Sequence, residues 1–360
     1  MRATQVLGRI LLGIAIAIVS AWCVLAILRA PVGTPLVREE LAALFGLIAL
    51  AAWIGLFARR WRWRRHAFGA FAVALVAFVI GWSQIRPSND RSWRAEEAML
   101  PWAEIDGDRV TVHNIRNFSY RTETDFTPAY YDKTFDLQKL DSVDLVAVYW
   151  MGPDIAHILL SFGFAGEDYL AVSIEARKEQ GEGYSTLDGF FRHYELFYVV
   201  ADERDVLGVR ALYRNDPTED VYLYRLQGPP ENARRVFLEY LRQINSLRDR
   251  PEFYNTLRTN CTTTIWMNAH VNAERVPFSW KVLVSGHVPA YLYEAGRLDT
   301  SLSFEELKRR GHVNQRAREA GPAAPDFSQR IREGLPGMRV AGMRRNSPGE
   351  SESRRDGSRP

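Results

Sequence analysis

A cysteine at a predicted helix start is the residue of this 360-residue chain best placed for covalent chemistry. Asn260 is a good N-cap residue, and Ile265, Trp266 and Ala269 supply an apolar face, so a helix is expected to begin at Cys261. Free N–H groups and the helix dipole favour the nucleophilic thiolate at such a position. The same N–H groups, from Cys261 and Asn260, suit an oxyanion, which points to acyl transfer. A buried, inert cysteine is the alternative that the local sequence leaves open.

A nucleophilic thiol needs a base, and histidine is the usual one. His270 follows Cys261 by nine residues, about 13 Å along a helix axis at 1.5 Å per residue, which is too far. His157 opens an apolar strand, where a side chain can face a neighbouring helix. Glu175 ends the strand expected to pair with that of His157, so it could orient the imidazole. An ordinary structural role remains the alternative for Glu175 and for each lone histidine, His157 included; the others are His113, His193, His287 and His312.

These residues lie in a region, from about 92 to 310, whose pattern predicts one α+β domain. Gly163 and Gly166 predict a turn that joins two strands into a hairpin. A helix is expected after Pro230, because apolar residues recur there at helical spacing. Residues 311–360 are predicted as a disordered basic tail, and Pro, Gly, Ser and Arg dominate after Pro322. The expected strands, rich in β-branched and aromatic residues, cover 109–113, 143–150, 157–164, 169–174, 195–200 and 221–226.

Residues 1–85 are predicted as a membrane anchor with three transmembrane helices, at about 6–28, 41–57 and 67–83. Arg2, Arg9 and the arginine-rich run 59–65 mark the cytoplasmic side. Three crossings then put the N-terminus inside and everything after Gln84 outside. The alternative is three buried helices of a soluble protein.

Composition narrows the class of protein further. A net charge of +3 gives no reason to expect nucleic-acid binding. Cys23 lies inside an apolar stretch, so no disulfide with Cys261 is expected. No phosphate loop is present, and no cofactor is expected. A zinc site of cysteine, histidine and glutamate is a weak alternative, because no CxxC or HxxxH spacing supports it.

An ordered set of motifs resembles a known family. The segments are Arg116–Tyr120, His157–Phe164, Val172–Arg177, and Tyr254–Leu257 leading to Asn260–Thr263. Together they resemble the Lnb N-terminal periplasmic domain family over about 114–273. The resemblance implies a circularly permuted relative of NlpC-type papain-like enzymes, with an antiparallel sheet and packed helices.

The resemblance also implies roles for individual residues. In the permuted order histidine precedes cysteine, and His157, Glu175 and Cys261 match that order as catalytic residues. By the same resemblance Asn260, Thr262 and Tyr254 support the site, and Arg177 and Tyr184 are candidates for substrate binding. No metal ligand is implied.

The family name implies lipoprotein N-acylation at the outer face of the cytoplasmic membrane. The expected reaction moves an acyl chain from a membrane phospholipid through a Cys261 thioester to the N-terminal amine of a bacterial lipoprotein. The expected location is a multi-pass inner-membrane protein with its catalytic domain in the periplasm. Two alternatives stay open: a cell-wall peptidase or amidase with the same residues, and a non-enzymatic membrane-tethered binding module. An apolar groove that faces the membrane favours the acyltransferase, and a polar open cleft favours the hydrolase.

Overall fold

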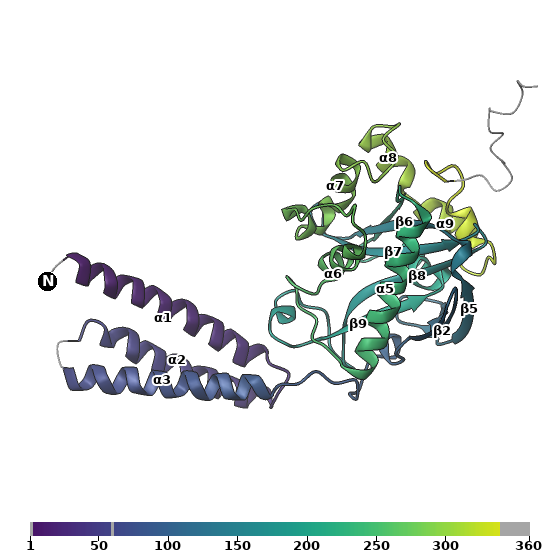
Figure 1. The fold of residues 1–360 in the computed structure, drawn as a ribbon. Coiled ribbons are helices and arrows are strands. Elements are labelled where there is room, and N and C mark those ends of the chain that lie inside the picture. The colour runs from purple at the N-terminus through teal and green to yellow at the C-terminus, as the bar shows by residue number, and fades with distance from the viewer. Residues whose placement is uncertain (1–2, 59–60, 339–360) are drawn as a thin grey trace, which may run out of the picture.

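The computed structural model describes residues 3–58 and 61–338, and its first part is a bundle of three helices (Figure 1). These are α1 (Ala3–Arg29), α2 (Pro35–Gly55) and α3 (Trp61–Gln84). Two stretches, Thr4–Arg29 and Arg62–Gln84, are long and apolar enough to cross a membrane. The prediction of three membrane-spanning helices is therefore wrong in number.

Charge near its start explains why α2 differs. Arg38, Glu39 and Glu40 lie in the first turns of α2. The uncharged remainder, 41–55, is shorter than the about 20 residues that span a bilayer core. α2 nevertheless packs between α1 and α3, and its buried residues are Ala42, Phe45, Ala49, Ala52 and Gly55. Arg59 and Arg60, which the predicted cytoplasmic loop included, lie outside the described residues.

The second part is a mixed α+β domain built on an eight-stranded sheet, which confirms the predicted class. The strand order is β1-β2-β9-β8-β7-β6-β10, with β5 also paired to β2. Neighbours are antiparallel except β2 and β9, which meet in parallel at Arg116↔Ala201. The strands are β1 (Trp102–Asp106), β2 (Arg109–Arg116), β5 (Tyr130–Asp136), β6 (Leu140–Tyr149), β7 (Ala156–Phe164), β8 (Asp168–Arg177), β9 (Glu195–Ala201) and β10 (Asp220–Arg225), and β3 (Ser119–Tyr120) pairs with β4 (Phe126–Thr127) apart from this sheet.

The predicted hairpin is confirmed in β7 and β8. Their ladder runs from Leu160↔Val172 to Phe164↔Asp168. Gly166 sits in the turn with φ +72°, a conformation that glycine adopts without steric cost. The ladder stops at Leu160, although β7 itself begins at Ala156, so the two strands separate at the end that carries His157.

Helices cover both faces of the sheet. On one face α5 (Pro230–Asp249) begins where the sequence predicts and buries Phe237 and Tyr240. α6 (Cys261–Asn268) and α7 (Val288–Glu294) lie on the same side. On the other face α4 (Glu203–Leu212) packs with α9 (Asn314–Ala320) and α10 (Phe327–Arg330). α8 (Phe304–Gly311) contacts β10.

The predicted disordered tail is wrong for residues 311–338, which are part of this second layer. Phe327, Ile331 and Leu335 are buried in its core. Arg332 is buried as well, and it pairs with Asp144 at 2.8 Å and Glu203 at 2.6 Å. A low apolar content therefore hid an ordered segment, because a few apolar side chains and one buried arginine fix it. Residues 339–360 lie outside the described part.

Candidate active site

The predicted helix start at Cys261 is confirmed. Asn260 has extended backbone angles, and its side chain accepts a hydrogen bond from the Thr263 N–H at 2.8 Å. The Thr263 hydroxyl accepts in turn from the Asn260 N–H at 3.1 Å, which completes a capping box. The Asn260 N–H is therefore occupied and does not face an oxyanion, contrary to expectation. Among the described residues, the Cys261 N–H donates to no other backbone group.

The thiol of Cys261 lies where β7 and β8 separate. α6 contacts both strands there. The Ile158 N–H lies beyond the end of the β7·β8 ladder, and it is one of the groups that lower the pKa of the thiol. The thiol also lies close enough to His157, the neighbour of Ile158, for each group to shift the pKa of the other. A thiol and an imidazole about a hundred positions apart in the chain are thus in contact.

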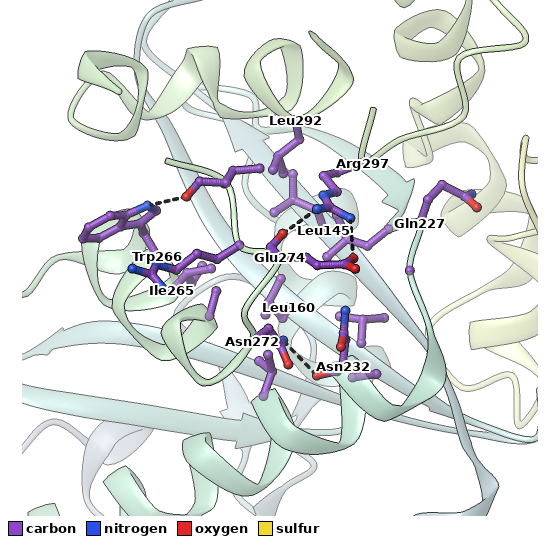
Figure 2. Close-up of a pocket in the computed structure, with 18 of the residues that line it drawn as sticks. Leu145, Leu160, Gln227, Asn232, Ile265, Trp266, Asn272, Glu274, Leu292 and Arg297 are labelled. Carbon is purple, nitrogen blue, oxygen red and sulfur yellow. Dashed lines mark hydrogen bonds and ion pairs between the residues drawn. The ribbon is translucent and has the colours of Figure 1, made fainter. Parts of the chain in front are cut away.

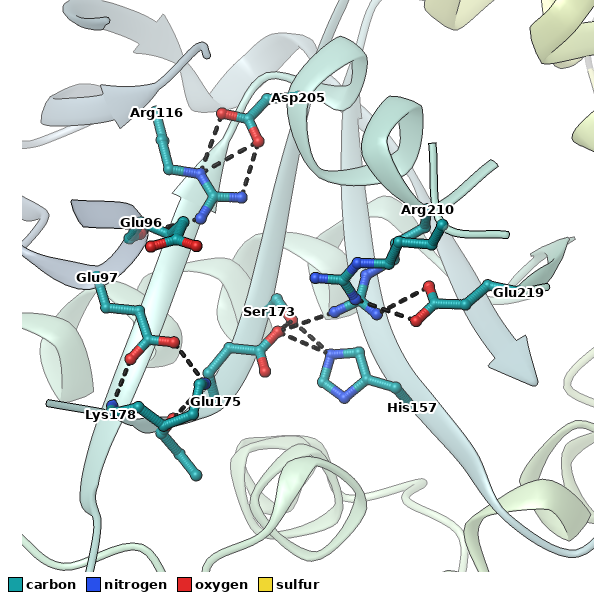
Figure 3. Close-up of polar contacts among 12 residues, drawn as sticks. Glu96, Glu97, Arg116, His157, Ser173, Glu175, Lys178, Asp205, Arg210 and Glu219 are labelled. Carbon is teal, nitrogen blue, oxygen red and sulfur yellow. Dashed lines mark hydrogen bonds and ion pairs between the residues drawn. The ribbon is translucent and has the colours of Figure 1, made fainter. Parts of the chain in front are cut away.

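His157 is held from its other side by β8 (Figure 3). Its Nε2 lies 2.6 Å from the Ser173 Oγ and 3.1 Å from the Glu175 Oε1. Ser173 also donates to Glu175 at 2.6 Å. The β7·β8 register, continued past Leu160↔Val172, sets His157 opposite Glu175. With Nε2 engaged in this way, Nδ1 is the nitrogen left for the thiol.

Glu175 is itself fixed by an arginine from the helical layer on the other face. Arg210 in α4 reaches Glu175 at 3.2 Å and Glu219 at 3.2 Å (Figure 3). Arg214 adds a second contact to Glu219 at 3.0 Å. Arg210 is buried, so these charges interact in a medium that screens them weakly. The arrangement keeps the Glu175 carboxylate both ionised and oriented.

The electrostatics favour an ion pair between thiolate and imidazolium. Burial opposes protonation of the His157 ring, but the Glu175 carboxylate outweighs it and raises the pKa of His157 to about 9. Burial opposes ionisation of Cys261, yet the hydrogen bond and charge of His157 hold the pKa of the thiol below its ordinary value. Burial likewise opposes ionisation of Glu175, but His157 and Arg210 hold its pKa well below the usual range. This charge pattern activates a cysteine nucleophile.

An apolar cavity of about 210 Å³ lies on the face of the sheet that α5, α6 and α7 cover (Figure 2), and His157, Glu175 and Cys261 are not among the residues that line it. Ile158 and Thr262, the chain neighbours of His157 and Cys261, belong to its wall. Asn232, Asn272 and Arg297 supply polar groups at the cavity. Its apolar lining comes from both the sheet and the helices, including Leu145, Leu160, Ala233, Val236, Ile265, Trp266 and Leu292.

Comparison with known proteins agrees with this placement. Residues 126–286 match the family model of the Lnb N-terminal periplasmic domain. The chain contains a domain of this family. The match includes His157, Glu175 and Cys261. No curated protein and no solved structure matches the chain, so the papain-like likeness stays a prediction. The family and the two candidate membrane helices make this a membrane-anchored protein with a periplasmic domain.

The predicted supporting residues of the Lnb domain occupy positions around α6. The buried Thr262 hydroxyl donates to the Val282 carbonyl at 2.6 Å, which ties the helix start to a later loop. Asn260 supports the site by capping α6, and its side-chain amide donates a hydrogen bond to the Thr256 carbonyl at 2.6 Å. Tyr254 is buried near the thiol, and burial together with the charge of Cys261 raises its pKa.

The two predicted substrate-binding residues differ in exposure: Arg177 is buried and Tyr184 is exposed. Arg177 is only 2% exposed, and it donates to the carbonyls of Glu97 and Ala98 at 2.9 Å each. Its guanidinium also stacks on Trp93 at 4.1 Å. Arg177 therefore braces the fold and is not open to a substrate. Tyr184 is exposed and lies 3.4 Å, oxygen to oxygen, from Tyr254, so it lies at the margin of the site.

Sequence reasoning missed two residues of the Lnb site. Ser173 shares a strand face with Glu175, since alternate residues of a strand point the same way, and that spacing could have found it. Arg210 lies within a helix and has no local signal. The other histidines of the domain have partners of their own: Asp132 for His113, Glu182 for His193, the Trp266 carbonyl for His270, Asp154 for His287 and Asp220 for His312. Among the described residues no His, Cys, Asp and Glu group suits a metal ion.

Proposed function

We propose that this protein is a cysteine acyltransferase of the outer face of the cytoplasmic membrane. It would move an acyl chain from a membrane phospholipid to the N-terminal amine of a lipoprotein. The observation that carries the proposal is the closeness of Cys261 to His157, together with an apolar cavity lined by their chain neighbours Thr262 and Ile158. A hydrolase of cell-wall peptides would need a polar cleft, whereas an acyl chain fits an apolar one.

The first step forms a thioester. The Cys261 thiolate attacks the ester carbonyl carbon of the phospholipid, and a bond forms between sulfur and carbon. The negative charge that develops on the carbonyl oxygen is met by the Cys261 N–H at the start of α6. The ester C–O bond then breaks, and protonated His157 gives its proton to the leaving alkoxide of the lysophospholipid.

The second step transfers the acyl group. Neutral His157, oriented by Ser173 and Glu175, takes a proton from the attacking amine. The amine nitrogen bonds to the thioester carbon, the C–S bond breaks, and the thiolate returns. Water in place of the amine would give a fatty acid, which is the hydrolase outcome.

The position of the helices supports delivery from a bilayer. α1 and α3 both end beside the domain, at Arg29 and Gln84, and α2 returns the chain between them (Figure 1). This arrangement places the periplasmic domain directly beside the ends of the two candidate membrane helices, within reach of the lipid surface.

Intact-mass analysis of the full-length protein tests the proposal. The protein is incubated with phospholipid vesicles, and a mass increase of one acyl chain is expected at Cys261, removable by hydroxylamine. The Cys261→Ala variant should gain no such mass, while Cys23→Ala, which removes the other thiol, should behave as the native protein. An adduct that persists in Cys261→Ala would contradict the mechanism. Adding a lipopeptide with a free N-terminal amine separates transfer from hydrolysis.

A further inference from the structure

The segment 276–284, between α6 and α7, has two apolar sides. Val276 and Val282 line the cavity. Phe278, Trp280 and Leu283 point the other way and are 53%, 57% and 41% exposed. Large apolar side chains that cluster on a surface mark a contact with a partner or a membrane. The segment 276–284 therefore forms a wall between the cavity and the exposed surface of the domain.

The exposed side continues onto the loop before β7. Met151 and Ile155 are exposed there. Gly286 joins the two loops, because its N–H donates to the Asp154 carbonyl at 2.9 Å. A Cβ at Gly286 would lie 2.1 Å from the Pro153 carbonyl oxygen, so the close approach requires glycine. We call Met151, Ile155, Phe278, Trp280 and Leu283 the apolar rim.

Two contacts between the domain and the helical bundle show which side of the domain faces the membrane. Arg192 donates to the Trp82 carbonyl, near the end of α3, at 2.7 Å. Arg29, at the end of α1, pairs with Asp188 at 3.1 Å. In Figure 1, α6 and α7 lie on the side of the domain from which α1, α2 and α3 project. The segment between α6 and α7 belongs to that side.

We infer that the apolar rim is seated in the outer leaflet of the bilayer that α1 and α3 cross. Its occupant is phospholipid, because the anchor already fixes this side at the lipid surface, where a second protein would have to displace the membrane. Trp280 suits the level of the headgroups, where indole rings prefer to lie. The exposed Arg275, next to the rim, can meet lipid phosphates. An acyl chain would then pass from the leaflet around 276–284 into the cavity, and this last step rests on the proposed function.

Photo-crosslinking of the full-length protein tests the inference without reference to activity. Phe278 is replaced by p-benzoylphenylalanine, and the protein is reconstituted in vesicles of phosphatidylethanolamine and phosphatidylglycerol. Illumination should add the mass of one phospholipid. The matched control carries the same group at Ile105, which is 42% exposed on the edge strand β1. No lipid adduct at Phe278, an equal yield at Ile105, or a crosslink to a second copy of the chain would each overturn the inference.

A kinetic arm separates this inference from the proposed function. The variant Phe278→Ser with Trp280→Ser should form the Cys261 adduct about tenfold more slowly from vesicles, because two apolar anchors are lost. It should react unchanged with a short-chain ester in solution. Equal loss on both substrates would contradict a docking role. If native protein forms no adduct at all, the proposed function fails, while the crosslink still decides the docking.

Discussion

Arg210 in α4 lies 3.2 Å from Glu175, whose carboxylate is 3.1 Å from the imidazole of His157. The two contacts connect the helical layer on one face of the sheet to the reactive residues at its opened end. Glu175 is thus held between two cations, one permanent and one that titrates. The stability of the domain and the state of the thiol should therefore depend on the same arginine.

Replacing Arg210 with Met should lower the free energy of unfolding by about 3–5 kcal/mol, because Glu175 and Glu219 both lose the buried cation that lies between them. Urea denaturation of the purified protein measures the change. Arg204→Met is the matched control in the same helix. Arg204 pairs with Asp202 near the surface, and its loss should cost about 0–1 kcal/mol. Equal effects of the two substitutions would contradict the structural role given to Arg210.

The pH dependence of acylation should be bell-shaped. The rate rises as the Cys261 thiol ionises, at a pH below the ordinary pKa of a cysteine. It falls above about pH 9, where His157 loses the proton that the leaving alkoxide requires. Adduct formation measured by mass between pH 5 and pH 10.5 checks both limbs. Alkylation of Cys261 by iodoacetamide needs no acid, so it should not fall on the basic side.

Glu175→Gln should shift the basic limb toward lower pH. The Glu175 carboxylate raises the pKa of His157, so its removal lets burial lower that pKa. The maximal rate should fall by about 100-fold, a magnitude usual for loss of a group that orients or assists proton transfer. Glu179→Gln is the control, since Glu179 pairs with Arg91 away from the site. An unmoved basic limb in Glu175→Gln would remove Glu175 from the proposed mechanism.

The sequence was sufficient to predict His157, Glu175 and Cys261 as a group, and the structure brings them together. Their closeness could be predicted because each stands near the end of an element: a strand start, a strand end and a capped helix start. Their catalytic roles stay a prediction. Ser173 and Arg210 were missed for different reasons. Ser173 is a small buried hydroxyl within an apolar strand, and Arg210 reaches the site only through the packing of α4 on the sheet.

Charge and composition misled at the two ends of the chain. Three charged residues early in α2 shorten its apolar stretch, and the run 41–57 that follows them was nevertheless predicted to span the membrane. Composition likewise predicted disorder beyond residue 311, whereas Phe327 and Arg332 are buried there. Average composition cannot predict the ion pairs of Arg332 with Asp144 and Glu203, because these partners lie far away in the sequence.

Arg332→Met should therefore destabilise the domain by about 3–5 kcal/mol, since the buried Glu203 loses its arginine partner and Asp144 keeps only Arg225 of its two. Thermal unfolding followed by circular dichroism measures it. The control is Arg330→Met, two residues earlier, because Arg330 donates only to backbone carbonyls in the described structure and should change stability little. A destabilisation by Arg330→Met as large as that by Arg332→Met would argue against a buried ion-pair role for Arg332.

A bulky residue in the cavity should change which acyl chains are used. Ala233→Trp fills space on the α5 wall, so adduct formation from long-chain phospholipid should fall about tenfold or more, while short-chain esters react at nearly the native rate. Glu231→Trp, two residues earlier in α5 and exposed, is the control. If both chain lengths are affected alike in Ala233→Trp, the cavity does not hold the acyl chain.

The backbone at Gly189 connects the three N-terminal helices to the chain that precedes Cys261, so these helices do more than anchor the domain. The Gly189 carbonyl accepts from the Thr256 N–H at 3.1 Å, and a Cβ there would lie 2.4 Å from the Thr256 hydroxyl. Close to Gly189 in the chain, Asp188 pairs with Arg29 of α1, and Arg192 donates to the Trp82 carbonyl of α3. Thr256 lies a few residues before the reactive thiol. A variant that lacks residues 1–85 would remove the helix contacts of Asp188 and Arg192, and with them part of the support for residues 188–192. Contacts of the membrane helices thus continue, through Gly189 and Thr256, to the stretch of chain that leads into Cys261.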